Sequence, residues 1–302
     1  MVLINFKKIV SLIFSALLLS SCTNLKDDFS EEKFISLDST NSLENEQKIN
    51  RVVTLTSLST DIIDKIDYKK LVAIPGSSLF KEKKEFANLP RISMGRTPPN
   101  LEKIVSLKPD LVIGTKGFHD KIISKLNDIN IKTLSYEVRG WNDLNELIFL
   151  ISNKLNLNTK DVVNNFNNEF LSNCIISNNN HDSNLIILAS VKPLLSPNSN
   201  SWAGQMLERF NLNNLTKDID SKSEFKGYVN LSSEWILNQD PDNLILVETR
   251  KDQFSDFGED GPFSNLKSIK TNNVYRFNYY GLINPGSLSS IDNACKQLKQ
   301  LF

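Results

Sequence analysis

The chain has 302 residues, which is enough for two domains. Its 35 basic and 35 acidic side chains balance, which argues against a nucleic-acid or strongly acidic partner. It contains 2 histidines and no CxxC or Cys/His spacing typical of zinc, so a multi-histidine metal site is not expected.

The N-terminus has the pattern of a secretion signal. Two early lysines precede an apolar run over 9–19, which is too short to span a bilayer comfortably. Residues 19–22 (Leu-Ser-Ser-Cys) resemble the lipobox of bacterial lipoproteins. That resemblance implies a signal peptide over 1–21, cleavage before Cys22 and a lipid on its thiol. An ordinary signal peptide with a chance cysteine, or a short anchor helix, is the alternative.

Residues 22–50 are polar and lack apolar periodicity, which predicts a flexible tether. From Arg51 the pattern changes to alternating strands and helices, which is typical of a mostly parallel α/β sheet. We expect the first strands over 52–55, 71–74, 91–94, 111–114 and 132–136. We expect the first helices over 61–66, 101–107, 121–127 and 143–155.

A longer helical pattern follows over 159–176. Its apolar residues recur at helical spacing, at Val163, Phe166, Phe170 and Cys174. Because the alternating pattern restarts afterwards, we interpret 159–178 as a single long helix that links two lobes. The alternative is one more surface helix.

The second half repeats the α/β pattern. We expect strands over 185–188 and 273–277 and helices over 204–210 and 291–301. The predicted fold is therefore α/β, with an N-terminal lobe over 51–158, a C-terminal lobe over 179–302 and mostly parallel sheets.

Two of the three cysteines, Cys174 and Cys295, fall on the apolar faces of predicted helices. Free cysteine behaves as a small hydrophobic residue in such places. We therefore expect packed thiols in preference to a disulfide.

One short pattern occurs once in each half of the chain. Glu102 in the first half, and Glu234 in the second, is followed by a Pro-Asp pair and an apolar strand. The pairs are Pro109-Asp110 and Pro241-Asp242. This repeat suggests two similar lobes, with one glutamate placed equivalently on each.

Each copy reads as a short helix, a turn and a buried strand. Asn100 is expected to cap the first helix, and Ser232 or Ser233 the second. Proline ends each helix and favours an extended conformation in the residue before it.

The lipobox and the paired units resemble the substrate-binding lipoproteins of ABC importers, and more narrowly the group that binds iron-siderophores and cobalamin. The resemblance covers 51–302. Its most specific stretch is 95–102 (Gly-Arg-Thr-Pro-Pro-Asn-Leu-Glu), which is similar to a segment of hydroxamate-siderophore binding proteins. Residues 196–199 with 205–208 resemble the family's second-lobe loop and helix, and 274–281 its last strand and cleft loop.

The resemblance implies a ligand cleft between two lobes that one long helix joins. In that family one acidic residue on each lobe docks on arginines of the permease, which implies a docking role for Glu102 and Glu234. The alternative is that both glutamates stabilise helix N-termini, an effect of about 0.3–1 kcal/mol each. The two roles are compatible.

Open α/β sheets bind ligands beyond the carboxyl ends of their strands. The corresponding loops, expected to converge on the cleft, are 57–60, 75–78, 95–97, 115–119, 196–202, 249–250 and 278–283. Arg96 is the first candidate, because a guanidinium meets the anionic oxygens of a ferric siderophore with two parallel, charge-assisted hydrogen bonds. A helix cap or an ion pair with a nearby acid is its alternative role.

Other candidates supply charge, aromatic walls or a hydroxyl group. Thr97 precedes a proline and is biased to an extended conformation that helps fix its loop. Arg139 and Arg250 follow predicted strands and add positive charge. The remaining candidate ligand contacts are Phe118, His119, Trp202, Tyr279 and Tyr280. Each of these has an alternative role in the core or on the surface.

The resemblance to this family and to the lipobox implies a monomeric receptor without enzymatic activity, anchored by lipid at the cell membrane and facing the periplasm or the cell exterior. It captures a ferric siderophore and delivers it to an ABC transporter permease. The chelator oxygens already hold the iron, so no cofactor and no protein metal ligand are expected.

Three alternatives stay open. Within the same class of protein, the ligand is cobalamin, haem or another metal chelate. A two-lobed α/β enzyme is a more remote alternative, because the sequence has no nucleophile elbow and no glycine-rich phosphate loop. A structural lipoprotein without a small ligand is the third.

Overall fold

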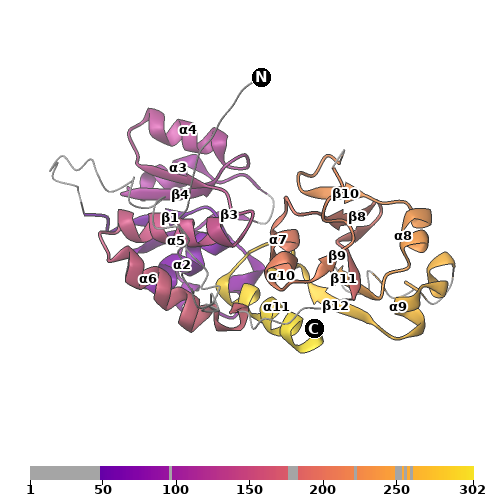
Figure 1. Cartoon of the computed structure of the whole chain (residues 1–302). Helices are drawn as coiled ribbons and strands as arrows, with labels where there is room; N and C mark the ends of the chain where they lie inside the picture. The colour runs from indigo at the N-terminus through magenta and orange to yellow at the C-terminus, as the bar shows by residue number, and fades with distance from the viewer. Residues whose placement is uncertain are drawn as a thin grey trace, which may run out of the picture. The chain divides into compact units, whose positions relative to one another are not determined.

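The computed structural model describes residues 48–94, 97–175, 183–220, 223–248, 254, 257–258 and 261–302 (Figure 1). The predicted signal peptide, Cys22 and nearly all of the predicted tether lie outside the described residues, as do Arg96 and Arg250. No helix in the described part of the chain combines the length and the apolar character needed to cross a membrane.

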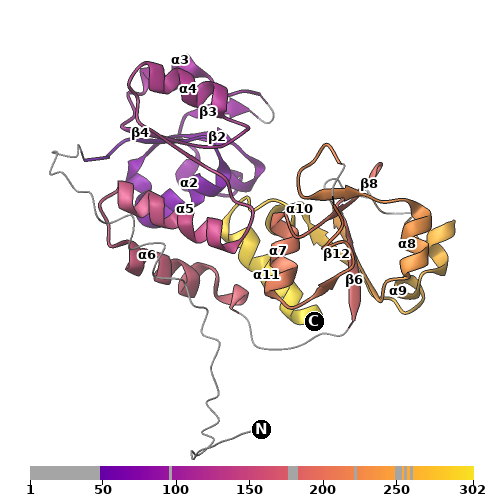
Figure 2. The same cartoon turned by 45° about the horizontal axis from the view of Figure 1, so that its top comes forward.

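The first lobe is built on a five-stranded sheet of order β3-β2-β1-β4-β5, in which all neighbouring strands are parallel (Figures 1 and 2). Its strands are β1 (Val52–Thr54), β2 (Leu71–Gly76), β3 (Arg91–Met94), β4 (Leu111–Thr115) and β5 (Thr133–Tyr136). Its helices are α2 (Ser57–Asp67), α3 (Leu101–Ser106), α4 (Asp120–Asp128) and α5 (Trp141–Lys154), with short 3₁₀ turns η1 (Tyr68–Lys70), η2 (Ser78–Phe80) and η3 (Lys84–Phe86). Every strand and helix predicted for this half is confirmed, with shifted ends.

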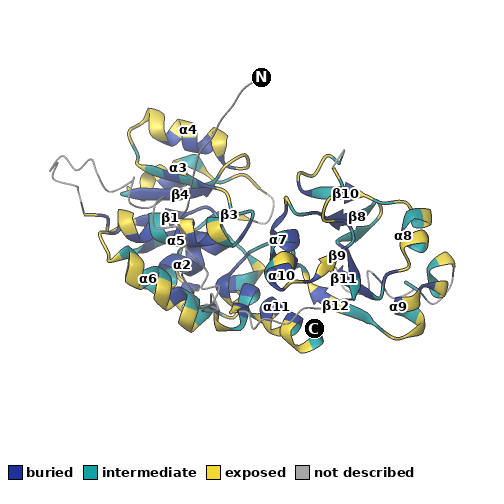
Figure 3. Ribbon diagram, in the orientation of Figure 1, coloured by how far each residue is buried: buried dark blue, intermediate teal, exposed yellow. Residues whose placement is uncertain are grey.

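Alternate residues of these strands face different helices. Val52 and Leu111 are buried together with residues of α2 and α5, whereas Val53 and Val112 are buried with residues of α3 and α4. A parallel sheet covered on both faces requires apolar residues at successive positions, because neighbours along a strand point to opposite faces. In Figure 3 the strands are buried, and the helices are exposed along their outer sides.

The second lobe has a four-stranded parallel sheet of order β12-β11-β6-β9 and a three-stranded antiparallel sheet of order β10-β8-β7. The parallel strands are β6 (Asn184–Leu188), β9 (Asn213–Asn214), β11 (Asn243–Glu248) and β12 (Val274–Asn278). The antiparallel strands are β7 (Ser190–Val191), β8 (Leu194–Pro197) and β10 (Tyr228–Asn230). The helices are α7 (Trp202–Arg209), α8 (Ser233–Gln239), α9 (Lys267–Lys270), α10 (Tyr279–Leu282) and α11 (Leu288–Leu301), with the 3₁₀ turn η6 (Pro262–Asn265). The predicted α/β fold with mostly parallel sheets is confirmed.

Several segments predicted as loops belong in part to regular structure, among them 75–76 in β2 and 279–282 in α10. Residues 57–60 form the first turn of α2, because Thr56 caps it with a side chain that accepts from the Ser59 amide at 3.2 Å. Ser196 and Pro197 lie in β8, within the antiparallel sheet that the sequence did not predict. Its strands are too short to show a period of two.

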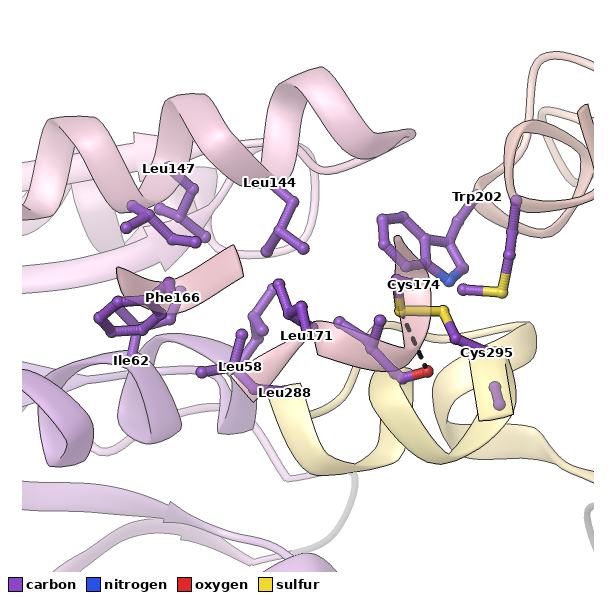
Figure 4. Packing of buried hydrophobic residues seen from close by; sticks show 14 of the residues in the cluster. Leu58, Ile62, Leu144, Leu147, Phe166, Leu171, Cys174, Trp202, Leu288 and Cys295 are labelled. Atoms are coloured by element: carbon purple, nitrogen blue, oxygen red, sulfur yellow. Dashed lines mark hydrogen bonds between the residues drawn. A yellow bond between two sulfur atoms is a disulfide. The ribbon is translucent and has the colours of Figure 1, made fainter. Parts of the chain in front are cut away.

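A single hydrophobic core contains residues of both lobes (Figure 4). Ile62 of α2 and Leu144 of α5 belong to it together with Trp202 of α7 and Leu288 of α11. Phe166, from the segment between the lobes, belongs to the same core. The lobes therefore share buried apolar surface, which disfavours their separation in water.

A buried carboxylate adds a polar connection between the lobes. Asp61 of α2 is 2 % exposed, and its Oδ2 accepts the Leu288 amide of α11 at 2.9 Å. Its Oδ1 accepts from Lys83 at 2.9 Å, and Lys83 also pairs with Asp64 at 2.8 Å. Burial lowers the pKa of Lys83, but its bonds to Asp64 and Asp61 outweigh that effect and raise it. The amine therefore stays charged beside its two carboxylates.

The helix predicted over 159–176 ends earlier. α6 (Thr159–Asn165) continues as a π-helical turn, η4 (Phe166–Phe170), and then gives way to a 3₁₀ turn, η5 (Ser172–Cys174). This exit lets Asn173 bond to Asp292 of α11, through its amide at 2.9 Å and its side chain at 2.6 Å. Residues 176–182 lie outside the described residues.

Cys174 and Cys295 form a disulfide, so the expectation of packed thiols was wrong. The Cα atoms are 5.0 Å apart, although 121 residues separate them in sequence. The apolar pattern shows that each cysteine is buried, but no local pattern reports that the two segments meet. The bridge ties the end of the linking segment to α11 (Figure 4), and such crosslinks stabilise by about 2–4 kcal/mol.

The repeated unit begins with the same cap in both lobes. The Asn100 side chain accepts from the Lys103 amide at 2.8 Å in α3, and the Ser232 side chain accepts from the Trp235 amide at 3.1 Å in α8. The predicted caps are confirmed, with Ser232 as the second one. Each cap satisfies a main-chain donor that the helix itself leaves free.

The aspartate of each Pro-Asp pair holds the start of a neighbouring strand. Oδ2 of Asp110 accepts the Arg51 amide at 2.9 Å, just before β1. Oδ2 of Asp242 accepts the Asn184 amide at 3.0 Å, at the first residue of β6. Since β1 pairs with β4 and β6 with β11, each aspartate bridges the entry of two adjacent strands.

The residue before each proline is left-handed, so the expected extended conformation was wrong. The φ angle is 45° at Lys108 and 41° at Asp240. A left-handed residue closes the last helical turn, and the Asp240 amide donates to the Ile236 carbonyl at 3.1 Å. The requirement of the helix end therefore prevails over the preference that proline imposes on its neighbour.

Candidate functional site

The two glutamates of the repeated unit occupy equivalent positions. Glu102 is the second residue of α3, and Glu234 is the second residue of α8. Both are exposed in the first turn of a capped helix. Each position suits contact with a partner and also places a carboxylate near a positive helix end.

The loop after β4 contains two predicted ligand residues with opposite environments. Phe118 is 77 % exposed, whereas His119 is 4 % exposed. Nδ1 of His119 accepts the Thr115 amide at 3.1 Å, and burial lowers the pKa of the ring, an effect that Asp120 partly opposes. The neutral imidazole closes the turn and packs edge to face on Phe118, with the ring centroids 4.9 Å apart.

A buried hydroxyl network, absent from the sequence prediction, lies at the carboxyl ends of β1 and β5. The Tyr136 hydroxyl is 2.5 Å from Oγ1 of Thr56, which is itself 2.7 Å from the Ser59 hydroxyl. Burial raises the pKa of Tyr136 to about 12, while the bonds to Thr56 and Ser59 act in the opposite direction. The phenol stays protonated and joins the end of β5 to the first turn of α2.

Charged residues follow β4 and β5 at the same edge of the sheet, beyond the carboxyl ends of these parallel strands. Arg139 donates to Oε2 of Glu137 at 2.5 Å. The hydrogen bond from Arg139 lowers the pKa of Glu137, and the charges of Lys226 and Lys116 lower it further. Lys116 lies within a predicted ligand loop, but nothing in the sequence places Lys226 of the second lobe near Glu137.

Trp202 lies in the core, as the first residue of α7. It is 5 % exposed, its Nε1 donates to the Gly281 carbonyl at 2.7 Å, and its ring stacks on Trp141 of the first lobe. Gly281 has a φ of 100°, and a Cβ there would collide with the Ser290 carbonyl, so this position requires glycine. Trp202 thus positions α7 against α10.

The predicted tyrosines begin α10. Tyr279 and Tyr280 are half-buried, and their rings meet edge to face at 5.3 Å. Burial, together with the neighbouring Tyr279, raises the pKa of Tyr228 on β10. A Cβ at Gly286 would collide with the Tyr280 ring and lie 3.0 Å from Leu79 of the first lobe. Tyr279 therefore lies near β10 of the second lobe, and Tyr280 lies near Leu79 of the first lobe.

Thr97 uses its hydroxyl inside its own turn. Its Oγ1 accepts the Met94 amide at 2.8 Å and donates to the Met94 carbonyl at 2.9 Å. Arg96 and Arg250 lie outside the described residues. The other predicted ligand residues fall in two groups, Phe118 with His119 after β4, and Trp202 with the two tyrosines around α7 and α10.

No group of three or more histidine, cysteine, aspartate or glutamate side chains is arranged to hold a metal ion within the described ranges. The geometry instead presents cations, an exposed aromatic ring and half-buried tyrosines near strand ends. The sequence profile described as "Periplasmic binding protein" matches residues 52–279. The chain belongs to the periplasmic binding protein family.

Solved structures of periplasmic binding proteins share the fold. An ABC transporter substrate-binding protein from Listeria monocytogenes is 20% identical, with 85% of this chain and 99% of that chain covered and a TM-score of 0.66. The vitamin B12 binding protein BtuF of Vibrio cholerae is 18% identical, covering 84% and 98%, with a TM-score of 0.62. Staphylococcus aureus IsdE, complexed with heme, is 21% identical, covering 85% and 99%, with a TM-score of 0.62. A search of curated proteins found no significant match.

Proposed function

We propose that this periplasmic binding protein is the substrate-binding component of an ABC importer, that it is not an enzyme, and that it delivers a ferric siderophore to the permease. The matched placement of Glu102 and Glu234 carries the proposal. An exposed carboxylate at the same place on each lobe suits docking on a two-part cationic surface, where such charges set orientation and encounter rate. The Listeria monocytogenes relative, an ABC transporter substrate-binding protein, supports this role.

For the ligand we propose an iron chelate whose anionic oxygens meet cationic side chains. The resemblance of 95–102 to hydroxamate-siderophore binding proteins supports this ligand. The exposed ring of Phe118, in the same loop as Lys116, offers apolar contact beside positive charge. Vitamin B12 and haem, bound by two of the structural relatives, are the alternatives.

The proposed ligand residues act in two ways. Arg96, Arg250 and Phe118 are assigned direct contact with the chelate, and Thr97 is assigned a supporting role through the bonds of its hydroxyl to Met94. The more enclosed residues, which hold the loops and complete the walls, are His119, Trp202, Tyr279 and Tyr280. The iron stays within its chelator, so the protein supplies no metal ligand.

The remaining assignments concern location and organisation. We place the protein at the cell membrane, anchored through lipidated Cys22 and the tether 22–50, as a monomer facing the periplasm or cell exterior. The lobes are 51–158 and 179–302, linked by 159–178, and the ligand lies in a cleft between them.

Tryptophan-fluorescence titration of the mature protein tests the ligand assignment. The panel contains ferric hydroxamates, ferric citrate, a ferric catecholate, haem and cobalamin. We expect saturable quenching by an anionic ferric chelate, weakened in Arg96→Ala and partly retained in Arg96→Lys, which keeps the charge but loses the bidentate fork. Binding of haem or cobalamin alone would show that the ligand is not a ferric siderophore. Binding of none of these compounds would contradict a receptor function.

A further inference from the structure

Glu137 and Arg139 form an ion pair at the carboxyl end of β5. Arg139 donates to Glu137 at 2.5 Å, and the two side chains are 42% and 43% exposed. The Lys116 amide donates to the Tyr136 carbonyl at 2.7 Å, which places Lys116 beside Glu137 on the adjacent strand end. Two cations of the first lobe therefore flank one carboxylate.

The second lobe reaches the same place through α7. Gly140, next to Arg139, lies so close to the Gln205 side chain of α7 that a Cβ there would collide with it. Gly227, next to Lys226, packs on the backbone just before α7, where a Cβ would lie 2.7 Å from the Asn200 carbonyl oxygen. Both glycines thus bring their charged neighbours to the same helix, in agreement with the effect of Lys226 on the pKa of Glu137.

We propose that Lys116, Arg139 and Lys226 form an anion-binding site that spans both lobes, and that Glu137 is its resident carboxylate. A negatively charged group of the ligand exchanges with Glu137 on Arg139. That this group belongs to a ferric chelate rests on the proposed function; the anion site does not depend on it.

The environment of the site sets the class of ligand. Exposed ion pairs are weak, so a ligand group with more than one negative charge replaces the carboxylate readily. A neutral group gains nothing from the three cations and leaves Glu137 in place. Exposed phenylalanines are close in sequence to two of the cations: Phe118 follows Lys116 by two residues, and Phe225, which is 56% exposed, directly precedes Lys226. The site therefore fits an anionic group attached to an apolar or planar body.

Sulfate is a suitable probe, because it is doubly charged at neutral pH and requires no knowledge of the chelator. The mature protein, labelled with ¹⁵N on arginine, is titrated with sulfate while the Arg139 Nε–H resonance is followed by NMR. We expect Glu137→Gln to bind sulfate about tenfold more tightly than the unmodified protein, because one nearby negative charge has been removed. Arg139→Gln should lose the binding, and Lys226→Gln should weaken it.

Glu169→Gln is the matched control, since it removes one exposed carboxylate from the linking segment and should leave sulfate binding unchanged. Equal or weaker sulfate binding in Glu137→Gln would overturn the resident-carboxylate role. Sulfate binding in Lys226→Gln as tight as in the unmodified protein would overturn the contribution of the second lobe. Since the probe is sulfate, failure of every chelate in the fluorescence panel would contradict the proposed function and leave this result standing.

Discussion

In both lobes the aspartate of the Pro-Asp pair accepts a main-chain amide at the start of a neighbouring strand. Its other bonds differ between the lobes. Among the described residues, Asp110 accepts main-chain amides only, those of Asn50 and Arg51. Asp242 accepts the Asn184 amide and also the side chain of Lys267 at 2.5 Å.

The strand ends differ more than the strand starts. The first lobe closes its edge with a hydroxyl network and a buried histidine, and the second with an antiparallel sheet and the Trp202–Gly281 bond. The repeated unit therefore organises the start of each sheet, and the unrepeated loops give each lobe its own chemistry.

The largest expected effect tests whether the lobes are functionally equivalent. The double variant Glu102→Lys/Glu234→Lys should abolish import of radiolabelled iron while ligand affinity stays unchanged, because both charges on the proposed docking face are reversed. Each single variant should lose part of the import. Glu169→Lys is the control for a reversed charge elsewhere. A parallel loss of ligand affinity would show that the glutamates are not docking residues.

The disulfide distinguishes the lobes, because it ties α11 to the linking segment. Cys174→Ser/Cys295→Ser should lower the free energy of unfolding by about 2–4 kcal/mol, measured by urea denaturation. Adding a reductant should destabilise the unmodified protein by a similar amount and leave the variant unchanged. An unchanged midpoint in the variant would contradict a stabilising role for the bridge.

Removing the paired aspartates compares the two strand entries. Asp110→Ala should cost about 1–2 kcal/mol, because main-chain amides lose a charged acceptor. Asp242→Ala loses one such amide bond together with the exposed ion pair to Lys267, which is weak, so it should cost less than Asp110→Ala, which loses two amide bonds. An equal or larger cost for Asp242→Ala, measured by urea denaturation at neutral pH, would show that the ion pair stabilises the strand entry as much as a main-chain bond does.

Acid should reduce the contribution of Asp242. Its bonds to Lys267 and to the Asn184 amide hold the pKa of Asp242 below the ordinary value of 3.8. A lowered folded-state pKa gives stability that is present above 3.8 and is lost as the pH falls through the folded-state value. The stability gap between the unmodified protein and Asp242→Ala should therefore narrow in acid. A constant gap across urea titrations at pH values above and below 3.8 would contradict this.

The smallest expected effect concerns the strand end of the first lobe. Tyr136→Phe removes the hydroxyl bonded to Thr56 and should cost about 1 kcal/mol of unfolding free energy. Tyr275→Phe, on the edge strand β12 of the second lobe, is the matched control and should cost less. A larger loss of unfolding free energy in Tyr275→Phe would show that the Tyr136 hydroxyl is not the more stabilising of the two.

The sequence by itself predicted the α/β fold, the helices and strands of the first lobe, and the cap Asn100, and it narrowed the second cap to Ser232 or Ser233. These features depend on side-chain period and on hydrogen bonds between residues a few positions apart, and such information is local. The equivalence of Glu102 and Glu234 was readable for the same reason, because the unit around each glutamate is repeated.

Only the tertiary structure decided which distant residues meet. The disulfide, the bond from Leu288 to Asp61 and the influence of Lys226 on Glu137 each join segments far apart in the chain. It also decided that His119 and Trp202 are enclosed, which their loop positions did not indicate. Local pattern records which face of an element is apolar, whereas partners across the molecule are selected by packing of the whole chain.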